Sequence, residues 1–91
     1  MLKIKREKTF IKDLKKVKMS DSQYQKYISY ISKLINKEQL PPEAKDHSLL
    51  GEWKDIREFH LGGDLLVLYK IEEDTLYLIR IGSHSQLFKK F

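Results

Sequence analysis

The first third of the chain has a short strand-like pattern followed by a helix-like pattern. Leu2 and Ile4 alternate with lysines, and this two-residue period predicts a short first strand with one buried face. From about Lys8 onwards, apolar residues recur at helical spacing with lysines on the opposite side, which predicts an amphipathic helix of about three turns. Its apolar positions are Phe10, Ile11, Leu14 and Val17.

A second helix is predicted after a polar interruption. Ser20 and Gln23 have the form of a capping box, in which two residues cap each other's backbone N–H groups. The apolar positions that follow have the clearest helical period in the chain, so we expect them to pack against a sheet rather than to form a base-stacking surface. The helix is expected to end at Leu40-Pro41-Pro42, because proline lacks an N–H group and disfavours helix in the residue before it. The apolar positions are Tyr24, Tyr27, Ile28, Ile31, Leu34 and Ile35.

The C-terminal half predicts strands joined by tight turns. Residues 45–53 lack periodicity and are expected to form a loop, and a strand follows over residues 53–61. Gly62-Gly63 predicts a two-residue hairpin, since adjacent glycines accept the positive φ of the favoured turns. The next strand, residues 65–69, is apolar on both faces and is therefore expected to be central. A last strand follows another turn and is expected to break at Gly82.

These elements predict an α+β fold of order β-α-α-β-β-β. The two N-terminal helices are expected to pack on one face of a small antiparallel sheet. Polar side chains, and with them the function, are then expected on the opposite face. A chain of 91 residues supports one hydrophobic core, so residues 1–91 are expected to form a single domain.

Composition excludes several classes of protein. The longest apolar run, residues 65–69, is far too short to cross a membrane, and the first residues lack the apolar segment of a secretion signal. We therefore expect a cytoplasmic protein with no membrane partner. The absence of cysteine excludes disulfides and thiol catalysis.

Positive charge is concentrated at the N-terminus. Residues 1–18 contain eight lysines and arginines but two acidic residues, a net charge of +6, whereas the remaining 73 residues carry −1. Such a basic segment indicates an anionic partner, either nucleic acid or an acidic protein segment, although a solvated lysine face would have the same composition. Lys12, Lys15 and Lys16 are the candidates for this contact.

The candidate chemistry lies in the C-terminal half, which holds all three histidines. His47 is on the predicted loop, His60 ends the strand before the glycine pair, and Asp64 leaves that turn. Pairing across the hairpin is expected to bring His60 near Asp64. Arg80 and His84 share one face of the last strand if the backbone stays extended between them.

These side chains suit RNA cleavage through the 2′-hydroxyl. That reaction needs a base for the hydroxyl proton, an acid for the leaving 5′-oxygen and positive charge at the phosphate. Histidine can act as base and acid near neutral pH, and arginine matches phosphate oxygens. Each group also has an ordinary structural explanation, from an exposed loop histidine to a turn aspartate. No metal is required, and a zinc site of three histidines is disfavoured because the short ligand spacing typical of zinc is absent.

Four linked motifs resemble the YafQ branch of the RelE-like toxins. The resemblance covers essentially the whole chain, including the order of the elements. It implies the toxin of a type II toxin–antitoxin pair, an endoribonuclease that cleaves mRNA, generally on the translating ribosome, by acid–base chemistry without a metal or other cofactor. The motifs are Lys45-Asp46-His47-Ser48-Leu49-Leu50-Gly51-Glu52-Trp53, Arg57-Glu58-Phe59-His60, Asp64-Leu65-Leu66-Val67-Leu68-Tyr69 and Arg80-Ile81-Gly82-Ser83-His84-Ser85-Gln86-Leu87-Phe88.

The resemblance also implies roles for individual residues. His84 and Asp64 are the leading acid–base candidates. Arg80 would stabilise charge on the phosphate, and Phe88 would position a base. The other implied site residues are His47 and His60, which would assist or orient the substrate, and Lys45 as a further substrate contact.

A partner protein is implied as well. An acidic antitoxin encoded beside the toxin would wrap it, and the complex would bind operator DNA and repress the operon. The basic segment, residues 1–18, would receive either ribosomal RNA or this antitoxin. Two rival functions remain: a non-enzymatic ParE-like toxin that binds DNA gyrase, and a ribonuclease that cuts free RNA without the ribosome. The set of histidines, aspartate and arginine argues against a pure binder.

Overall fold

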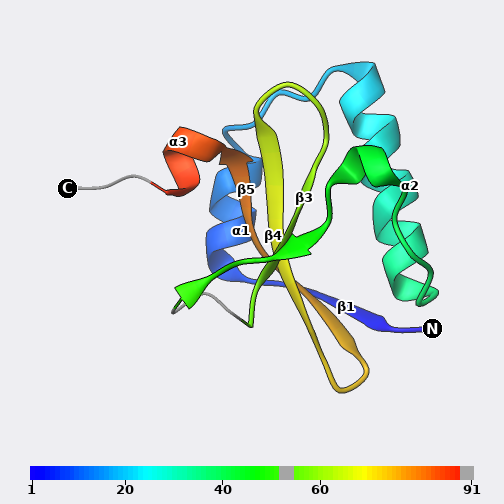
Figure 1. The fold of residues 1–91 in the computed structure, drawn as a ribbon. Coiled ribbons are helices and arrows are strands. Elements are labelled where there is room, and N and C mark those ends of the chain that lie inside the picture. Colours follow the sequence, from blue (N-terminus) through cyan, green and yellow to red (C-terminus); the bar gives the residue numbers. More distant parts are fainter. Residues whose placement is uncertain (52–54, 89–91) are drawn as a thin grey trace.

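The sheet has five strands in the order β1-β5-β4-β3-β2, and helices α1 and α2 pack on one of its faces (Figure 1). The computed structural model describes residues 1–51 and 55–88, so the expected strand start at Trp53 lies outside the described residues. The strands are β1 (Lys3–Arg6), β2 (His47–Ser48), β3 (Arg57–His60), β4 (Leu65–Glu72) and β5 (Thr75–Ser83). The helices are α1 (Lys8–Leu14), α2 (Asp21–Ile35), α3 (His84–Leu87) and the short 3-10 helix η1 (Pro42–Ala44).

The α+β class is confirmed, but the sheet is mixed rather than wholly antiparallel. Strands β3, β4 and β5 form the expected antiparallel meander. Strand β1 pairs in parallel with β5, with Lys3 opposite Thr75 and Arg6 opposite Leu78. The sequence pattern predicted β1 but not its partner, because the path of the chain through α1 and α2 decides where β1 joins the sheet. Strand β2 and helix α3 were not predicted.

Both long helices begin where the sequence predicts and end earlier than expected. The capping box of α2 is present, with the Gln23 N–H 3.1 Å from Ser20 Oγ and the Ser20 N–H 3.0 Å from Gln23 Oε1. Helix α2 ends at Ile35 rather than at the prolines, because Lys37 takes a left-handed φ of 59°. The Lys37 N–H then donates to the Leu34 carbonyl at 3.0 Å, and the Glu38 N–H donates to the Lys33 carbonyl at 2.8 Å. This is a Schellman motif, which closes the helix locally. Within the described ranges, no helix is both long enough and apolar enough to span a membrane.

The hairpin between β3 and β4 has a three-residue loop, residues 62–64, rather than the predicted two-residue loop. The Leu61 N–H donates to the Leu65 carbonyl at 2.9 Å and closes the loop. The two glycines have φ values of 103° and 59°, which L-residues rarely adopt. The additional loop residue is Asp64, which is exposed at the tip of the hairpin.

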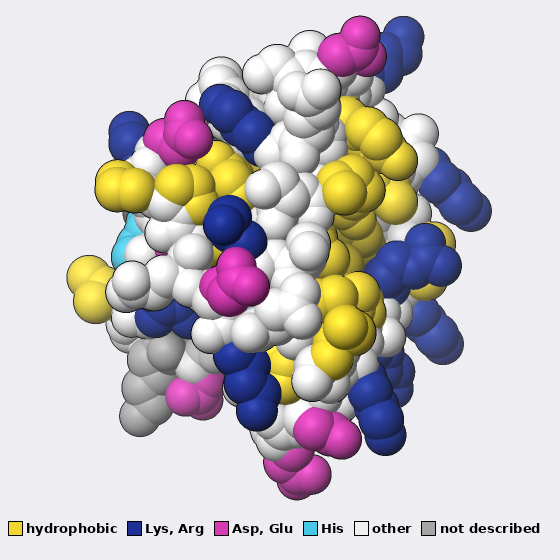
Figure 2. Space-filling view, turned by 90° about the vertical axis from the view of Figure 1, so that its right-hand side faces the viewer, with side chains coloured by type: hydrophobic (Ala, Val, Ile, Leu, Met, Phe, Trp, Pro, Cys, Tyr) yellow, Lys and Arg dark blue, Asp and Glu magenta, His cyan; other side chains and the backbone are white. Residues whose placement is uncertain are grey.

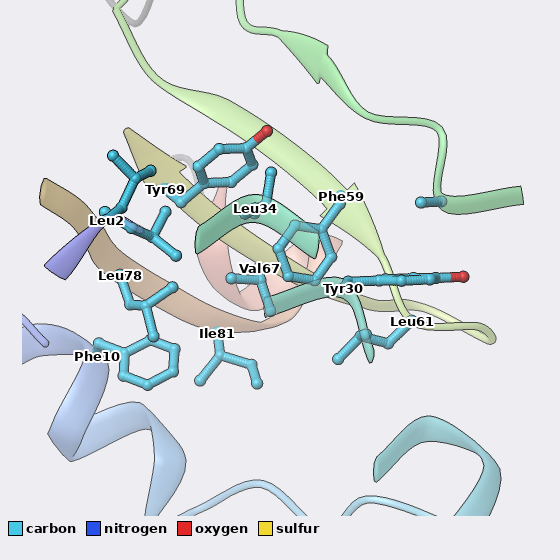
Figure 3. Packing of buried hydrophobic residues seen from close by; sticks show 12 residues of the cluster. Leu2, Phe10, Tyr30, Leu34, Phe59, Leu61, Val67, Tyr69, Leu78 and Ile81 are labelled. Atoms are coloured by element: carbon cyan, nitrogen blue, oxygen red, sulfur yellow. The ribbon is translucent and has the colours of Figure 1, made fainter. Parts of the chain in front are cut away.

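The main core lies between the sheet and the two long helices (Figure 3). Phe10 of α1 and Tyr30 of α2 are buried against β3, β4 and β5. The Tyr30 ring meets the Phe59 ring edge-on at a centroid distance of 5.7 Å. The helical periods therefore identified the core faces, except that Tyr24 and Ile28 remain exposed. The core residues of the sheet are Phe59, Leu61, Val67, Tyr69, Leu76, Leu78 and Ile81.

The opposite face of the sheet carries a second apolar cluster and is not the purely polar face that the sequence predicted. Leu66 and Leu68 of β4 are buried there with Leu87 of α3. Helix α3 packs against β5, so a face that would otherwise expose two leucines is partly covered. Partly buried side chains surround this cluster at Leu49, Ile56, Ile79 and Phe88.

Candidate active site

Strands β2 and β3 bring His47, Glu58 and His60 together. His47 is directly opposite Glu58 across the antiparallel pair, and His60 is two residues beyond Glu58, on the same face of the strand. His47 Nε2 lies 3.1 Å from Glu58 Oε1, and His60 Nε2 lies 3.4 Å from the same oxygen. Two predicted site histidines therefore meet through a glutamate that the sequence analysis did not include. We call these three residues the His–Glu–His cluster.

The contacts of His47 assign its Nδ1 as a hydrogen-bond donor. His47 Nδ1 lies 2.7 Å from the Lys45 carbonyl oxygen, which can only accept, so Nδ1 carries a proton. His47 Nε2 can then approach Glu58 Oε1 favourably if a second proton lies between them, either on an imidazolium or on a carboxyl group.

Glu58 differs from the two histidines in its burial. It is only 5% exposed, whereas the His47 side chain is 53% exposed. Its second oxygen, Oε2, is buried and has no hydrogen-bond partner among the described residues. An unsatisfied buried carboxylate oxygen is costly, so a hydrogen-bond donor or a cation at Oε2 would stabilise it.

The same three side chains can also hold a metal ion. Their ligand atoms all lie within 4.8 Å of one another. Imidazole nitrogens and a carboxylate oxygen are ligands that suit zinc and copper. The sequence pattern did not predict this set, because its members are separated by 11 and 2 residues and only the pairing of β2 with β3 brings them together.

A second polar network holds the segment that carries His47. The Tyr69 hydroxyl donates to Asp46 Oδ1 at 2.6 Å, and Arg57 Nε lies 3.2 Å from the same oxygen. Burial raises the pKa of Tyr69, and its hydrogen bond to Asp46 raises it further. Because Asp46 precedes His47 directly, the network fixes the start of β2 on the core and orients the cluster.

Arg80 is held by Asp13 of α1 instead of pointing freely from the strand. Its Nε lies 2.6 Å from Asp13 Oδ2 and its Nη2 lies 3.1 Å from Oδ1. The Ile81 N–H also donates to Oδ2, at 3.1 Å. The hydrogen bond to Asp13 raises the pKa of Arg80. Its side chain is still 34% exposed and borders a hollow of about 220 Å³ with Lys16 and Gln86.

The register of the sheet places Arg80 in line with Glu58. Glu58 pairs with Leu68, and Leu68 pairs with Arg80, beside a bulge that leaves Ile79 outside the ladder. Two strand spacings of about 4.8 Å separate the Glu58 and Arg80 backbones by roughly 10 Å. The Arg80 guanidinium itself is turned to Asp13 of α1.

His84 lies on α3, not on an extension of β5. The backbone turns at Ser83, whose hydroxyl accepts from the Gln86 N–H at 3.2 Å while Gln86 Oε1 accepts from the Ser83 N–H at 2.9 Å. The exposed His84 ring packs against Phe88, with ring centroids 4.8 Å apart. A side chain at Gly82 would come within 3.0 Å of Gln86 and 3.2 Å of Leu87. Gly82 therefore permits close packing of α3 and does not break the strand.

The remaining predicted site residues are exposed, and none of their described side chains forms a hydrogen bond or an ion pair with the side chains of the His–Glu–His cluster. Asp64 does not pair with His60, because the three-residue loop pairs His60 with Leu66. Asp64 instead borders a hollow of about 240 Å³ that also includes Lys16 and Gln86. The other exposed candidates are Lys12 and Lys15 near the end of α1 and Lys45 before β2.

Comparisons with known proteins agree with the motifs. Residues 2–89 match the family model of the bacterial toxin of the type II toxin–antitoxin system, YafQ. The mRNA interferase toxin YafQ of Escherichia coli K12 is 34% identical over 80 residues, which cover 87% of each chain. A copper-bound mutant toxin from Helicobacter pylori has a TM-score of 0.86 and 41% identity, covering 97% of this chain and 100% of that one. In the E. coli DinJ–YafQ complex, the matching chain has a TM-score of 0.82 and 31% identity, covering 97% of this chain and 99% of that one.

The fold and the family match together define a class. A small α+β chain of this architecture that matches the toxin profile over nearly its whole length is the toxin of a toxin–antitoxin pair. The chain belongs to the YafQ family of type II toxins. The resemblance drawn from the motifs is confirmed.

Proposed function

We propose that this toxin is an mRNA interferase that cleaves RNA by acid–base transesterification, with the His–Glu–His cluster at its catalytic centre. The observation that carries the proposal is that His47 Nε2 and His60 Nε2 both lie within 3.4 Å of Glu58 Oε1, with the His47 side chain 53% exposed. The E. coli K12 relative, which is 34% identical to this chain, is named mRNA interferase toxin YafQ, and this supports mRNA as the substrate.

In the proposed reaction, side chains of the toxin supply both the base and the acid. A base of the cluster removes the 2′-hydroxyl proton, and the 2′-oxygen attacks the adjacent phosphorus. The bond from phosphorus to the 5′-oxygen breaks, and an acid protonates that oxygen. The products are a 2′,3′-cyclic phosphate and a free 5′-hydroxyl. No electron acceptor or other reagent is needed.

The positions of the side chains favour a division of roles. Glu58, as the buried member with an unsatisfied oxygen, is the proton acceptor, with His47 and His60 sharing its proton. His84 is exposed on a separate element and is the proton donor to the leaving group. Arg80, fixed by Asp13, stabilises phosphate charge, and Phe88 stacks on a base. His60 pairs with Leu66 rather than with Asp64, so the role assigned to Asp64 is substrate contact.

The partners follow from the charge and the family. The proposed substrate is mRNA on the translating ribosome in the cytoplasm, with Lys12, Lys15, Lys16 and Lys45 as contacts to RNA phosphates. An acidic antitoxin neutralises the toxin, and only their complex binds operator DNA. A protein named DinJ forms a complex with the E. coli relative, which supports such a partner.

The test is to map the ends of cleaved RNA. The purified toxin is incubated in excess chelator with a defined mRNA, with and without translating ribosomes. We expect cleavage that leaves a 2′,3′-cyclic phosphate. A matched RNA with a 2′-deoxy nucleotide at the scissile position should resist cleavage there.

Three results would change the proposal. Cleavage at the 2′-deoxy position would exclude attack by the 2′-hydroxyl. Loss of cleavage in chelator would exclude a metal-independent reaction. No cleavage in either setting would favour the non-enzymatic, gyrase-binding alternative.

A further inference from the structure

A basic hollow lies beside strand β1 and the start of helix α1. It has a volume of about 800 Å³, and its lining contains four Lys or Arg residues against two acidic ones, so it favours an anionic occupant. We call this hollow the lysine groove. Its cationic residues are Lys5 and Arg6 of β1, Lys8 of α1 and Lys70 of β4.

The register of the sheet places the lysine groove on the face that carries the His–Glu–His cluster. Lys70 is two residues after Leu68 in β4, so the two side chains lie on the same face. Leu68 is opposite Glu58 of the cluster. Tyr77 of β5 is opposite both Lys70 and Lys5, so these three side chains form one row across the sheet. This row lies about 6.7 Å along the strands from the row that contains Glu58.

The lysine groove also has an apolar part, which is continuous with the second apolar cluster. Ile56 and Ile79 line the groove and pack against the buried leucines of that cluster, Leu66, Leu68 and Leu87. Apolar side chains therefore lie between the lysines and the histidines. Unpaired bases can rest on such a surface while their phosphates contact charged side chains beside it.

The lysines of the groove carry charge that the rest of the protein does not neutralise. Among the described residues, the exposed Lys5 and Lys8 make no ion pair or side-chain hydrogen bond. Lys70 lies 3.6 Å from Glu72, but Glu72 is 64% exposed, and exposed ion pairs contribute little. Lys70 Nζ also lies 5.3 Å from the centre of the Tyr77 ring. Three ammonium groups are therefore available to an incoming anion.

The lysine groove connects the two edges of the sheet. Figure 2 shows Lys and Arg side chains gathered along the right-hand side of one face of the molecule and a His side chain at the opposite margin. Strand β1, which carries Lys5, forms one edge of the sheet, and β2, which carries His47, forms the other. Lys70 lies between them, on β4. The groove thus offers phosphate contacts on a path from the basic segment to the candidate active site.

We propose that the lysine groove binds the phosphates of the mRNA nucleotides next to the scissile one. Lys70 contacts the nearest of these phosphates, and Lys5 and Lys8 contact those further from the His–Glu–His cluster. The groove suits a single strand rather than a duplex, because it combines separate charges with an apolar surface for unpaired bases. That the RNA is mRNA rests on the proposed function.

The first test measures binding of a single-stranded RNA that cannot be cleaved. The probe is a short fluorescent oligonucleotide with 2′-O-methyl groups throughout, and its anisotropy is followed over a range of salt concentrations. Lys5→Gln combined with Lys70→Gln should weaken binding about tenfold, and the slope of log affinity against log salt should become shallower by about 0.7 for each lysine lost. The matched control, Lys26→Gln combined with Lys33→Gln, removes the same charge from α2 and should retain wild-type affinity.

Lys5→Gln alone separates the loss of charge from a loss of folding. Lys5 has no ion pair or side-chain hydrogen bond to lose among the described residues, so this variant should keep the wild-type unfolding midpoint and still make the slope shallower by about 0.7. Equal affinity of the double variant and its control would overturn the groove as an RNA site. The same conclusion would follow if the wild-type toxin did not bind the probe at low salt. Neither result would affect the assignment of the cleavage reaction, which is measured separately.

The second test places the groove relative to the scissile bond. A series of ribosome-bound mRNAs carries a single uncharged methylphosphonate linkage at successive positions on either side of the scissile linkage. For the wild-type toxin, substitution at neighbouring positions on one side should raise KM about tenfold with little change in kcat, because the lost contact binds the substrate and takes no part in the chemistry. At those positions, the double variant should lose nothing further.

Two further outcomes separate mRNA from ribosomal RNA and this inference from the proposed function. If the double variant binds ribosomes weakly but no methylphosphonate position matters, the groove holds ribosomal RNA and the proposed occupant is wrong. If the wild-type toxin binds the probe through these lysines but cleaves no RNA, the proposed function and mRNA as the occupant are both overturned, whereas the groove remains an RNA-binding site.

Discussion

Glu58 is the residue on which the candidate site depends most. It is the buried member of the cluster, it contacts both His47 and His60, and one of its oxygens lacks a partner among the described groups. A buried carboxylate flanked by two imidazoles can exchange protons with either of them. We therefore propose that the His–Glu–His cluster acts as one proton-transfer unit rather than as three independent groups.

Glu58→Gln should remove the proton acceptor with little change in shape. We expect the rate of RNA cleavage to fall by roughly 10²- to 10⁴-fold, the usual contribution of a general base. The midpoint of thermal unfolding should change little, because the amide oxygen can still accept from the histidines. The measurement is single-turnover cleavage of a defined RNA.

Glu72→Gln is the matched control, because Glu72 is an exposed carboxylate at the end of β4. It should cleave RNA at the wild-type rate. A Glu58→Gln toxin that is as active as this control would assign the base to another residue, with His84 and the two cluster histidines as the next to test.

Among the secondary-structure elements, helix α3 determines the position of His84. This single helical turn is held by the reciprocal cap of Ser83 and Gln86, by the packing of Leu87 on the second apolar cluster, and by the lack of a side chain at Gly82. Its position is thus set by a few weak contacts. Because a short helix is marginal without its cap, the cap is the contact most easily tested.

Ser83→Ala should release α3 without touching His84. Loss of an N-cap hydroxyl costs about 1 kcal/mol, which should increase amide exchange in residues 84–87. We expect cleavage to slow by about tenfold, since a misplaced catalytic group loses much of its orientation. Ser83→Thr keeps a hydroxyl cap and should restore both exchange protection and activity. Normal cleavage by Ser83→Ala would show that the position of His84 does not depend on the cap.

In the molecule as a whole, the basic segment and the candidate active site lie at different edges of the sheet. The chain has a net charge of +5. The segment 1–18, which includes β1 and α1, carries +6, and the other residues carry −1. The His–Glu–His cluster lies at the opposite edge of the sheet. A polyanion as large as a ribosome can contact the basic segment and deliver a single mRNA strand to the catalytic edge at the same time.

Reversal of charge on α1 and its C-terminal extension tests this arrangement. The triple variant Lys12→Glu, Lys15→Glu and Lys16→Glu should bind ribosomes at least tenfold more weakly, and the dependence of binding on salt should become shallower because fewer counterions are released. Binding is measured by sedimentation with ribosomes over a range of salt concentrations.

A control triple with the same charge change, Lys26→Glu, Lys33→Glu and Lys37→Glu, places the new charges on α2 and just beyond it. This control should retain ribosome affinity. Equal weakening by the two triples would mean that net charge alone, rather than the surface of α1, governs the contact.

Local patterns determined the elements that depend on near neighbours in the chain. The periods of α1 and α2, the Ser20 capping box and the β3–β4–β5 meander were all predicted, because side-chain spacing and turn residues act within a few positions. The early end of α2 was missed, since a non-glycine residue, Lys37, adopts the left-handed conformation there. The motifs gave the family, and with it His47, His60 and His84 as candidates.

Only the tertiary structure decided which side chains meet. Strand pairing joined His47 to Glu58, and packing of α1 on the edge of β5 joined Asp13 to Arg80, across separations in the chain that no local pattern encodes. The same is true of the parallel partner of β1 and of the lysine groove beside it. Sequence alone specified the local elements and the chemical types present, because these depend on short-range spacing. The fold specified their neighbours, because contacts between distant segments depend on how the whole sheet and its helices pack.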